Sequence, residues 1–509
     1  MQHRGTNPGR VFLVGAGPGD PGLITLRGVE CLRQADLVLY DYLVNPALLD
    51  HAPPSAEVAC LGHHPRPRMI PQDEVNRRMI DAARAGKTVV RLKGGDPHVF
   101  GRAAEEIAAL RAAGISFETV PGVTAALAVA GYVGIPLAHA DHASALALVT
   151  GEEKRGKAGP PLDYGLLADF PGTLIFYMGV GSVGRWSDAL LHRGKSPDTP
   201  VAIVRRCSWS DQETVRATLG TVAQVISERN LRPPAVIVVG EVVSFAPEVS
   251  WFTARPLFGV RVLVTRPREQ AGALFARLGE LGAQVDVQPA IRISDPADWG
   301  PVDAALAQLD RYDWLVFSSV NGVRYLLDRL LESRGDVRRL GNVRLAAIGP
   351  ATAEELTRYR LQADLLPGEY QAEALAAALA REAPGRTFLL ARASRGREVL
   401  AEQITAAGGT VHQIVVYSST DVEQADPEVA AALSDGRIDW VTVTSSAIAR
   451  SLARLFGHDL RRTKLASISP ITSEVLHELG YEAAVEATEY TMDGLVDVMV
   501  GFGEERASG

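Results

Sequence analysis

The chain has 509 residues, of which 47% are apolar, and a formal net charge of −8. The length predicts several domains, each able to bury a core, while the acidic balance argues against a nucleic-acid partner, which would need a concentrated basic face. Residues 1–10 lack the apolar segment of a signal peptide, and three widely spaced cysteines form neither a disulfide framework nor a metal-binding pair, so a cytoplasmic location is the simplest expectation.

A glycine-rich turn follows the strand that we predict over residues 11–14. Residues 15–22 read Gly-Ala-Gly-Pro-Gly-Asp-Pro-Gly. A dinucleotide-binding loop would have a third glycine where Asp20 stands, and Pro18 and Pro21 each remove an amide donor that a pyrophosphate would need. The turn is better suited to lining a pocket than to holding phosphate.

Short β-rich runs alternate with amphipathic helical stretches up to about residue 249, which predicts an α/β architecture. The expected helices include 72–85 and 102–113, and a break near residues 138–144 suggests two lobes. Residues 119–138 are uncharged, but they contain so many glycines and prolines that we expect strand, turn and buried helix and not a membrane span. The remaining expected strands are 37–40, 88–92, 146–149, 173–177, 201–204 and 235–239.

The second half contains an internal duplication. The segment from Asp313 to Arg324 matches the segment from Asp439 to Arg450, and residues 263–266 match 389–392 at the same offset. Residues 345–352 match 465–472. Three pairs in the same order predict a small doubly wound sheet used twice.

Serine and threonine clusters follow an apolar strand in each repeat, at residues 318–319 and 444–446. One interpretation is a helix N-cap, which these residues favour. The other is anion binding at the carboxyl edge of the sheet. The pattern leaves both open.

Four segments of the first half together resemble the tetrapyrrole methylases. They are Arg91–Arg102 (RLKGGDPHVFGR), Val120–Ala126 (VPGVTAA), Thr173–Gly179 (TLIFYMG) and Pro234–Glu241 (PAVIVVGE). The resemblance implies a two-lobed α/β fold, a class III methyltransferase, over residues 9–250, with lobes of about 9–138 and 139–250. It also implies uroporphyrinogen-III C-methyltransferase activity with S-adenosylmethionine as co-substrate and S-adenosylhomocysteine as product. The implied cofactor contacts are Pro18, Gly94, Gly95, Asp96, Val99, Thr124, Ala125, Met178, Cys207 and Ala235.

The same resemblance implies residues for the tetrapyrrole substrate. Asp41 would act as a base or as a substrate-orienting carboxylate, and Arg102 as a positioning cation, against the simpler roles of helix-terminal residue or surface ion pair. Residues 61–68 depart from the family pattern and keep only Gly62 literally, so Arg66 and Arg68 would supply positive charge for a substrate with eight carboxylates. A zinc site from His63, His64, His139 and His142 has no ligand spacing to support it, and we expect no metal.

The duplicated half resembles uroporphyrinogen-III synthase, on Val262–Pro267 (VLVTRP), Phe317–Val323 (FSSVNGV), Ile348–Ala353 (IGPATA), Val416-Tyr417 and Thr444–Ser446. The resemblance implies two flavodoxin-like lobes within residues 257–505: one of about 257–288 plus 418–505, the other of about 292–415. A two-stranded linker would comprise 285–293 and 411–418. Tyr417 would assist departure of hydroxide from hydroxymethylbilane, and Ser319, Ser445 and Thr472 would bind its carboxylates.

Together these features predict a bifunctional enzyme that cyclises hydroxymethylbilane to uroporphyrinogen III and methylates it twice, at C2 and C7, giving precorrin-2 for sirohaem or cobalamin synthesis. Its partners would be small tetrapyrroles, and the resemblance implies a homodimer through the first half. Two alternatives remain open: a methyltransferase whose second half only delivers substrate, and a sensor whose second half binds a tetrapyrrole or small anion.

Overall fold

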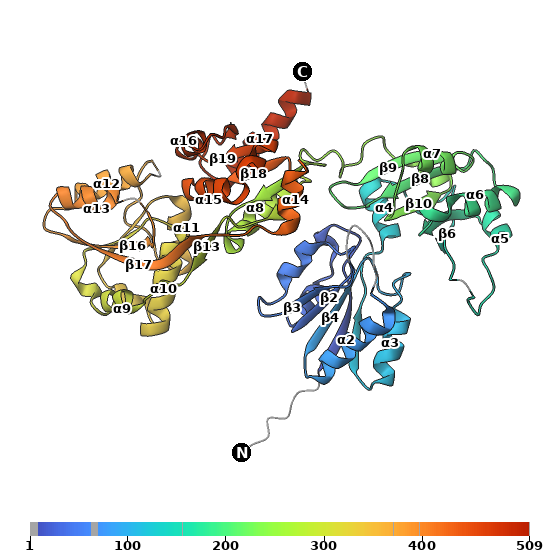
Figure 1. The fold of residues 1–509 in the computed structure, drawn as a ribbon, viewed down its shortest axis with the longest axis horizontal. Helices are drawn as coiled ribbons and strands as arrows, with labels where there is room; N and C mark the ends of the chain where they lie inside the picture. The colour runs from blue at the N-terminus through green and yellow to red at the C-terminus, as the bar shows by residue number, and fades with distance from the viewer. Residues whose placement is uncertain (1–8, 63–69, 155, 370, 397, 508–509) are drawn as a thin grey trace, which may run out of the picture. The chain divides into compact units, whose positions relative to one another are not determined.

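The computed structural model describes residues 9–62, 70–154, 156–369, 371–396 and 398–507. The chain divides into two compact units. The N-terminal unit reaches to Val260 and includes Gly279–Gln284, and the C-terminal unit comprises Arg261–Leu278 and Val285 onward (Figure 1).

The first sheet of the N-terminal unit is parallel throughout, in the order β3-β2-β4-β1-β5. Its inner strands are apolar on both faces, as a parallel sheet covered by helices requires. Phe12, Val14 and Val90 face one core, and Val11, Leu13 and Val89 face the other. The elements are β1 (Arg10–Gly15), η1 (Pro21–Leu23), α1 (Leu26–Leu32), β2 (Leu37–Tyr40), η2 (Pro46–His51), β3 (Glu57–Cys60), α2 (Gln72–Arg84), β4 (Thr88–Lys93), α3 (Ala103–Ala112) and β5 (Ser116–Val120).

The second sheet is mixed, in the order β6-β7-β10-β8-β9. Strands β6 and β7 pair in parallel, whereas β10 is antiparallel to both of its neighbours and β8 to β9. The elements are α4 (Ala125–Val133), β6 (Ala145–Thr150), α5 (Tyr164–Ala168), β7 (Gly172–Tyr177), η3 (Val180–Ser182), α6 (Val183–His192), β8 (Pro200–Arg205), β9 (Glu213–Thr218), α7 (Val222–Glu228), β10 (Ala235–Val239) and η4 (Glu241–Phe245).

The uncharged segment at residues 119–138 is the end of β5, a turn and the buried helix α4, as predicted. Ala126, Val129 and Val133 of this helix pack against Val236 and Val238 of the second sheet. Helix α4 therefore belongs to the core of the second lobe, although it precedes the predicted break. No helix among the described residues combines the length and the apolar character needed to cross a membrane.

The C-terminal unit confirms the predicted duplication. Its two sheets have the orders β12-β11-β18-β19-β20 and β13-β17-β16-β14-β15. The triplets β11-β18-β19 and β16-β14-β15 are the repeated strands, with matching parallel registers. The strands are β11 (Arg261–Val264), β12 (Gln284–Val287), β13 (Ile291–Ser294), β14 (Trp314–Phe317), β15 (Arg344–Ala347), β16 (Thr387–Ala393), β17 (Thr410–Asp421), β18 (Trp440–Val443), β19 (Lys464–Ser467) and β20 (Ala483–Glu486).

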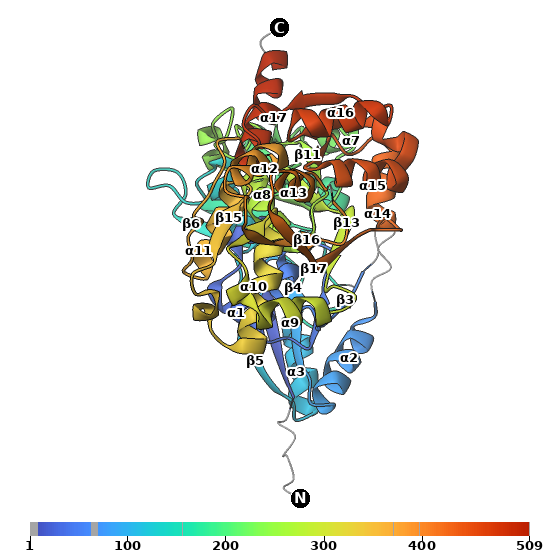
Figure 2. The ribbon, with the colours of Figure 1, turned by 90° about the vertical axis from the view of Figure 1, so that its left-hand side faces the viewer.

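Helices cover both sheets of this unit, and each repeated strand leads into a helix. The helices are α8 (Arg268–Glu280), α9 (Gly300–Ala307), η5 (Leu309–Arg311), α10 (Val320–Arg334), η6 (Val337–Leu340), α11 (Pro350–Arg358), α12 (Ala372–Ala380), α13 (Val399–Ala406), α14 (Pro427–Ser434), α15 (Ser446–Phe456), η7 (Gly457–Arg462), α16 (Pro470–Glu478) and α17 (Met492–Ala507). Figure 2 looks onto this unit, with α9 and α10 beside β13 and β17.

The two-stranded linker lies further along the chain than predicted. Ile291–Ser294 pairs antiparallel with Ser418–Asp421, whereas residues 411–417 pair with β16 inside the second sheet. The first part of the long strand β17 therefore pairs with β16 within the sheet, and its last four residues pair with β13 in the linker. The expected segments 285–293 and 411–418 are corrected accordingly, because Thr410–Asp421 contains no glycine or proline to mark where the strand changes partners.

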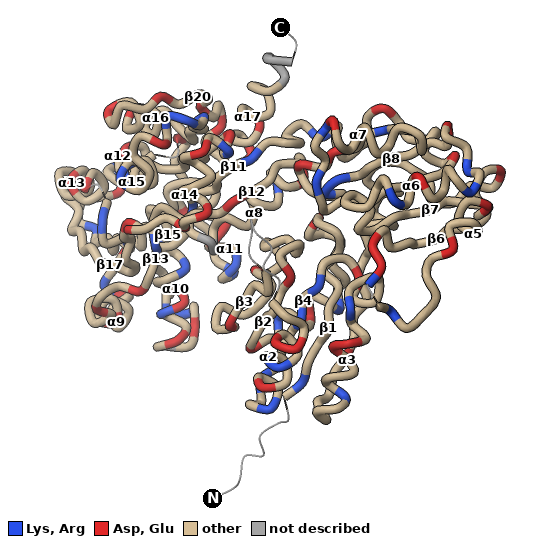
Figure 3. The backbone as a smooth tube through the Cα atoms, turned by 45° about the vertical axis from the view of Figure 1, so that its right-hand side comes forward, with Lys and Arg blue, Asp and Glu red and all other residues tan. Residues whose placement is uncertain are grey.

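Charged residues of both signs are interspersed over each unit (Figure 3). This distribution agrees with the acidic net charge, and the figure shows no concentrated basic face on either unit in this view.

Candidate active sites

Three loops meet at the carboxyl edge of the first sheet, after β1, β4 and β5. Gly17 and Gly95 form an isolated antiparallel bridge, with the Gly95 amide donating to the Gly17 carbonyl at 2.7 Å. A Cβ on Gly15 would lie 2.5 Å from the Gly122 nitrogen. The predicted motifs of the methylase half are therefore one packed constellation, and glycine at positions 15 and 122 is required by close backbone approach.

Asp96 holds two of these loops together. One carboxylate oxygen accepts the Gly122 amide at 2.9 Å and the other accepts the His98 amide at 2.7 Å. Asp96 is buried. Its demonstrated contacts are thus with backbone amides, so it shapes the predicted cofactor loop, and any contact with a ligand would use its remaining lone pairs.

The loop at Gly94 and Gly95 leaves room beside it. A Cβ on Gly95 would meet only Thr124, at 3.8 Å from its Cα, and a Cβ on Gly94 would meet only Leu43, at 3.4 Å. Val99 is half-buried in the same loop. Space of this kind beside a backbone with a φ of +67° at Gly95 is suited to close approach of a ligand.

The second lobe contributes a wall to the same site. The Tyr177 hydroxyl lies 2.6 Å from Thr124 Oγ1 and accepts the Ala126 amide at 2.9 Å, while its ring contacts Phe100 with centroids 5.0 Å apart. These contacts place Thr124 and Ala125 between the lobes. Ala235 begins β10, which pairs with β7 ahead of Met178.

Met178 is not an ordinary core methionine. It is 51% exposed and has a φ of +54°. Phe100, Arg102, Arg206 and Ser208 of this unit also have positive φ. Non-glycine residues in this conformation concentrate at functional sites, because the surrounding structure must hold them there.

Cys207, a predicted cofactor contact, is buried in the hydrophobic core of the second lobe. Burial raises its pKa to about 12, so its thiol is neutral and unsuited to nucleophilic chemistry.

The opening loop is tied to the second lobe by contacts that the sequence did not predict. Trp209 donates its indole N–H to the Pro18 carbonyl at 2.9 Å, and the Asp20 amide donates to Ser208 Oγ at 3.1 Å. The Tyr132 hydroxyl donates to Asp20 Oδ2 at 2.8 Å. Asp20, which excluded a dinucleotide loop, is thus a link between lobes.

The two residues expected to face the tetrapyrrole differ in their surroundings. Asp41 follows β2 and is partly exposed, with Oδ1 2.5 Å from Arg91 Nη2. Arg102 is an exposed helix N-cap residue that forms an ion pair with Glu105, its Nε lying 3.1 Å from Oε1. The observed contact is thus a surface ion pair, the simpler role expected for Arg102. The hydrogen bond to Glu105 raises the pKa of Arg102. Arg66 and Arg68, with His63 and His64, lie outside the described residues.

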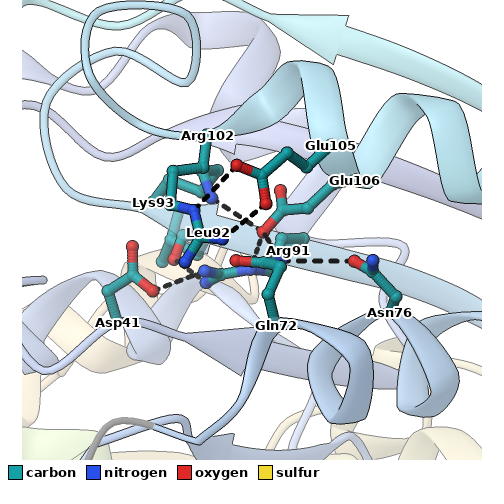
Figure 4. A network of polar contacts seen from close by, with 9 residues as sticks. All are labelled: Asp41, Gln72, Asn76, Arg91, Leu92, Lys93, Arg102, Glu105 and Glu106. Atoms are coloured by element: carbon teal, nitrogen blue, oxygen red, sulfur yellow. Dashed lines mark hydrogen bonds and ion pairs between the residues drawn. The ribbon is translucent and has the colours of Figure 1, made fainter. Parts of the chain in front are cut away.

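Beneath Asp41 lies a buried charge cluster, made of Arg91, Lys93 and Glu106 (Figure 4). Glu106 Oε1 accepts from Lys93 Nζ at 2.8 Å and from Arg91 Nε at 3.2 Å. The sequence contained a signal for this cluster, since Arg91 and Lys93 interrupt a central strand that should be apolar. The buried partner Glu106 was missed because a glutamate in a first helical turn ordinarily faces solvent.

In the C-terminal unit, the predicted catalytic residue Tyr417 contacts Ser319 and Tyr325. The Tyr417 hydroxyl lies 3.0 Å from Ser319 Oγ, and its ring stacks on Tyr325 with centroids 5.6 Å apart. Burial raises the pKa of Tyr417, so it is a neutral hydrogen-bond donor. Tyr325 also lines a cavity of about 450 Å³ together with Asn321, Gln270 and Arg324.

The three predicted carboxylate-binding residues of this unit are involved in helix capping. Ser319 accepts the Gly322 amide at 3.0 Å and Ser445 accepts the Ile448 amide at 3.2 Å. Thr472 is buried, and its amide donates to Ser469 Oγ, at the position that corresponds to Gly349 in the other repeat. The N-cap interpretation therefore describes the observed contacts, while carboxylate binding by these residues stays a prediction.

The fold and the loop constellation define a two-lobed α/β methylase unit followed by a duplicated two-sheet unit. Residues 10–223 match the family Tetrapyrrole (Corrin/Porphyrin) Methylases, and residues 272–497 match Uroporphyrinogen-III synthase HemD. The chain is 33% identical over 497 residues to the porphyrin biosynthesis protein HemD of Ruminiclostridium josui, covering 97% of this chain and 98% of that protein. The chain belongs to the family in which a tetrapyrrole methylase is fused to a C-terminal uroporphyrinogen-III synthase domain.

Two further similarities concern the N-terminal unit. An S-adenosyl-L-methionine-dependent uroporphyrinogen III methyltransferase of Methanosarcina barkeri is 44% identical over 237 residues, covering 47% of this chain and 93% of that protein. A crystal structure of uroporphyrin-III C-methyl transferase from Thermus thermophilus complexed with S-adenyl homocysteine is 41% identical, with a TM-score of 0.40, and covers 46% of this chain and 93% of that one.

Proposed function

We propose that this chain is a bifunctional enzyme that closes hydroxymethylbilane to uroporphyrinogen III and methylates that product at C2 and C7, giving precorrin-2. The observation that carries the proposal is the joining, in one chain, of a packed methylase loop constellation and a synthase unit with a buried tyrosine beside a cavity. The product of the second unit is the substrate of the first.

The residues of the N-terminal site fit S-adenosylmethionine. Gly94 and Gly95 offer backbone and free space, and the exposed thioether of Met178 gives a soft apolar wall. When bound, the co-substrate supplies an electrophilic methyl group. The chain's task is to orient the acceptor carbon in line with that methyl, which is catalysis by positioning. Asp41 orients the substrate or accepts its proton, and Arg102 with Arg66 and Arg68 attracts its carboxylates.

In the C-terminal unit, Tyr417 donates a hydrogen bond to the departing hydroxyl of the bilane. Its neutral phenol, buried and aligned by Ser319, is suited to that task. Ser319, Ser445 and Thr472 lie at helix N-termini, where backbone amides favour carboxylates.

Incubating the purified chain with hydroxymethylbilane, first without and then with S-adenosylmethionine, tests both activities. The first tube should yield type III uroporphyrinogen and the second a dimethylated product. Type I isomer alone in the first tube would leave the second unit a delivery module, and failure of both reactions would leave a tetrapyrrole-binding sensor.

The proposal also includes the oligomeric state of the protein and its location in the cell. A homodimer through the N-terminal unit is supported by Leu146 and Leu148, which are exposed on the edge strand β6, and sedimentation of a Leu146→Lys variant tests it. Cys31, Cys60 and Cys207 are free thiols, in keeping with a reducing cytoplasm.

A further inference from the structure

The buried cluster beneath Asp41 is unbalanced in charge. Its core contains two cations, Arg91 and Lys93, and one anion, Glu106. These three side chains are between 0% and 5% exposed, whereas the Asp41 side chain is 31% exposed. Asp41 is therefore both the second anion that balances the cluster and the member that reaches the surface of the lobe (Figure 4).

The cluster is built to fix the Arg91 guanidinium. Nε bonds to Glu106 Oε1, Nη1 donates to the Leu92 carbonyl at 3.2 Å, and Nη2 meets Asp41. Glu106 is itself held by Lys93 and by Gln72 Nε2, at 3.2 Å. All three arms of Arg91 are thus engaged, and one is aimed at Asp41.

Stability alone is a poor explanation for these charges. Ion pairs buried in a core are often no more stabilising than apolar residues of the same volume, because desolvation offsets their attraction. Burial, and to a smaller extent the neighbouring Arg91, lower the pKa of Lys93, so its surroundings disfavour the charged form. Glu106 Oε2 is buried and has no hydrogen-bond partner among the described residues.

We propose that Arg91 is a positioning residue for methylation: held by Glu106 and Lys93, it fixes the orientation of the Asp41 carboxylate, which then accepts hydrogen bonds from the N–H groups of the tetrapyrrole. The inference deepens the proposed function and rests on it. It assigns Asp41 an orienting role, since one of its oxygens is engaged by the Arg91 guanidinium and the carboxylate is thereby held in one direction.

A double-variant cycle tests the coupling. Arg91→Gln should lower kcat/KM for uroporphyrinogen III by about 10- to 100-fold, the loss expected for one charge-assisted hydrogen bond. In an Asp41→Asn background the same change should have an effect of less than about 2-fold, because its target is already lost. Affinity for S-adenosylhomocysteine, measured by calorimetry, should stay within about 2-fold of the parent for both variants.

Two further variants provide a substitute for Arg91→Gln and a matched control. Arg91→Lys keeps a buried cation and replaces Arg91→Gln in the cycle if that variant does not fold. In the Asp41→Asn background, Arg91→Lys should likewise change kcat/KM by less than about 2-fold. Lys87→Gln, at the end of the turn leading into β4, breaks the exposed pair with Glu57 at 3.0 Å and is the matched control, with methylation expected unchanged.

The proposal would be overturned if the losses of kcat/KM caused by the Arg91 and Asp41 variants multiplied in the double variant. It would also be overturned if the variants lost affinity for S-adenosylhomocysteine in parallel, because the cluster would then support the cofactor loop. Full activity of Asp41→Asn would also overturn it while leaving the proposed methylation intact. Failure of the parent chain to methylate would instead refute the proposed function itself.

Discussion

Replacing Gly95 by leucine should separate the two activities. Gly95 has a φ of +67°, so a side chain there costs about 1–2 kcal/mol of folding stability. A Cβ meets only ordinary contacts with Thr124, so the fold has room for it, and the added atoms enter the space that we assign to S-adenosylmethionine. Overpacking of that kind costs about 1–3 kcal/mol, or about 5- to 150-fold in affinity. Calorimetry with S-adenosylhomocysteine measures the loss, and cyclisation of hydroxymethylbilane should be unchanged.

The matched control is Gly114→Leu. Gly114 has a φ of +69° and no neighbour within 4 Å of a Cβ, and it lies between α3 and β5, at the end of β5 opposite the loop constellation. It imposes the same backbone strain without entering the site. Equal ligand affinity in Gly95→Leu and Gly114→Leu would refute the placement of the co-substrate, and loss of cyclisation in Gly95→Leu alone would refute the independence of the two units.

Two more predictions concern single groups. Tyr417→Phe removes the proposed donor and should slow formation of type III uroporphyrinogen by about 10²- to 10⁴-fold while methylation of added uroporphyrinogen III persists; Tyr312→Phe, which loses only an exposed hydrogen bond to His412, should remain active. Cys207 has its pKa raised by burial from 9.0 to about 12, so the unfolded chain releases this proton first and stability falls as pH rises from 9 towards 12. Between pH 8 and pH 10 the parent should lose about 1.4 kcal/mol more unfolding free energy than Cys207→Ala, as measured by urea denaturation.

Other thiols, lysines and tyrosines titrate over the same pH interval, but they are shared by the parent and Cys207→Ala and cancel in the difference. An identical pH dependence in the two proteins would contradict the buried, neutral thiol. Equal type III yield from Tyr417→Phe and Tyr312→Phe would likewise contradict a chemical role for Tyr417.

The sequence predicted inner strands better than edge strands. Strands β2 and β10 lie where their apolar runs placed them, because buried strands consist of consecutive apolar residues. Strands β3 and β9 were not predicted. Both are sheet edges, and their charged residues, among them Glu57, Glu213 and Arg216, leave no continuous apolar run by which to predict them.

Local motifs predicted the loops of the site, whereas the contacts between lobes had no local signal. Glycines at 15, 95 and 122 belong to recognisable patterns. Trp209, by contrast, contacts Pro18 across 191 positions of the chain, and nothing in its own segment indicates this. The buried Glu106 was missed for a different reason. It is adjacent to the exposed Glu105 on α3, and the sequence alone does not show which of the two neighbouring carboxylates faces the core.

The duplicated unit shows how equivalent positions acquire different roles. Ser319 and Ser445 occupy corresponding sites and cap corresponding helices, α10 and α15. Ser319 has a second contact, with the Tyr417 hydroxyl, and the strand that carries Tyr417 is the long β17, which leaves its sheet to form the linker. The symmetry of the repeat is therefore broken where the chain passes between lobes. Because a hydroxyl that already caps a helix and aligns a phenol has little capacity left for a carboxylate, the chemistry should depend more on Tyr417 than on Ser319 as an anion ligand.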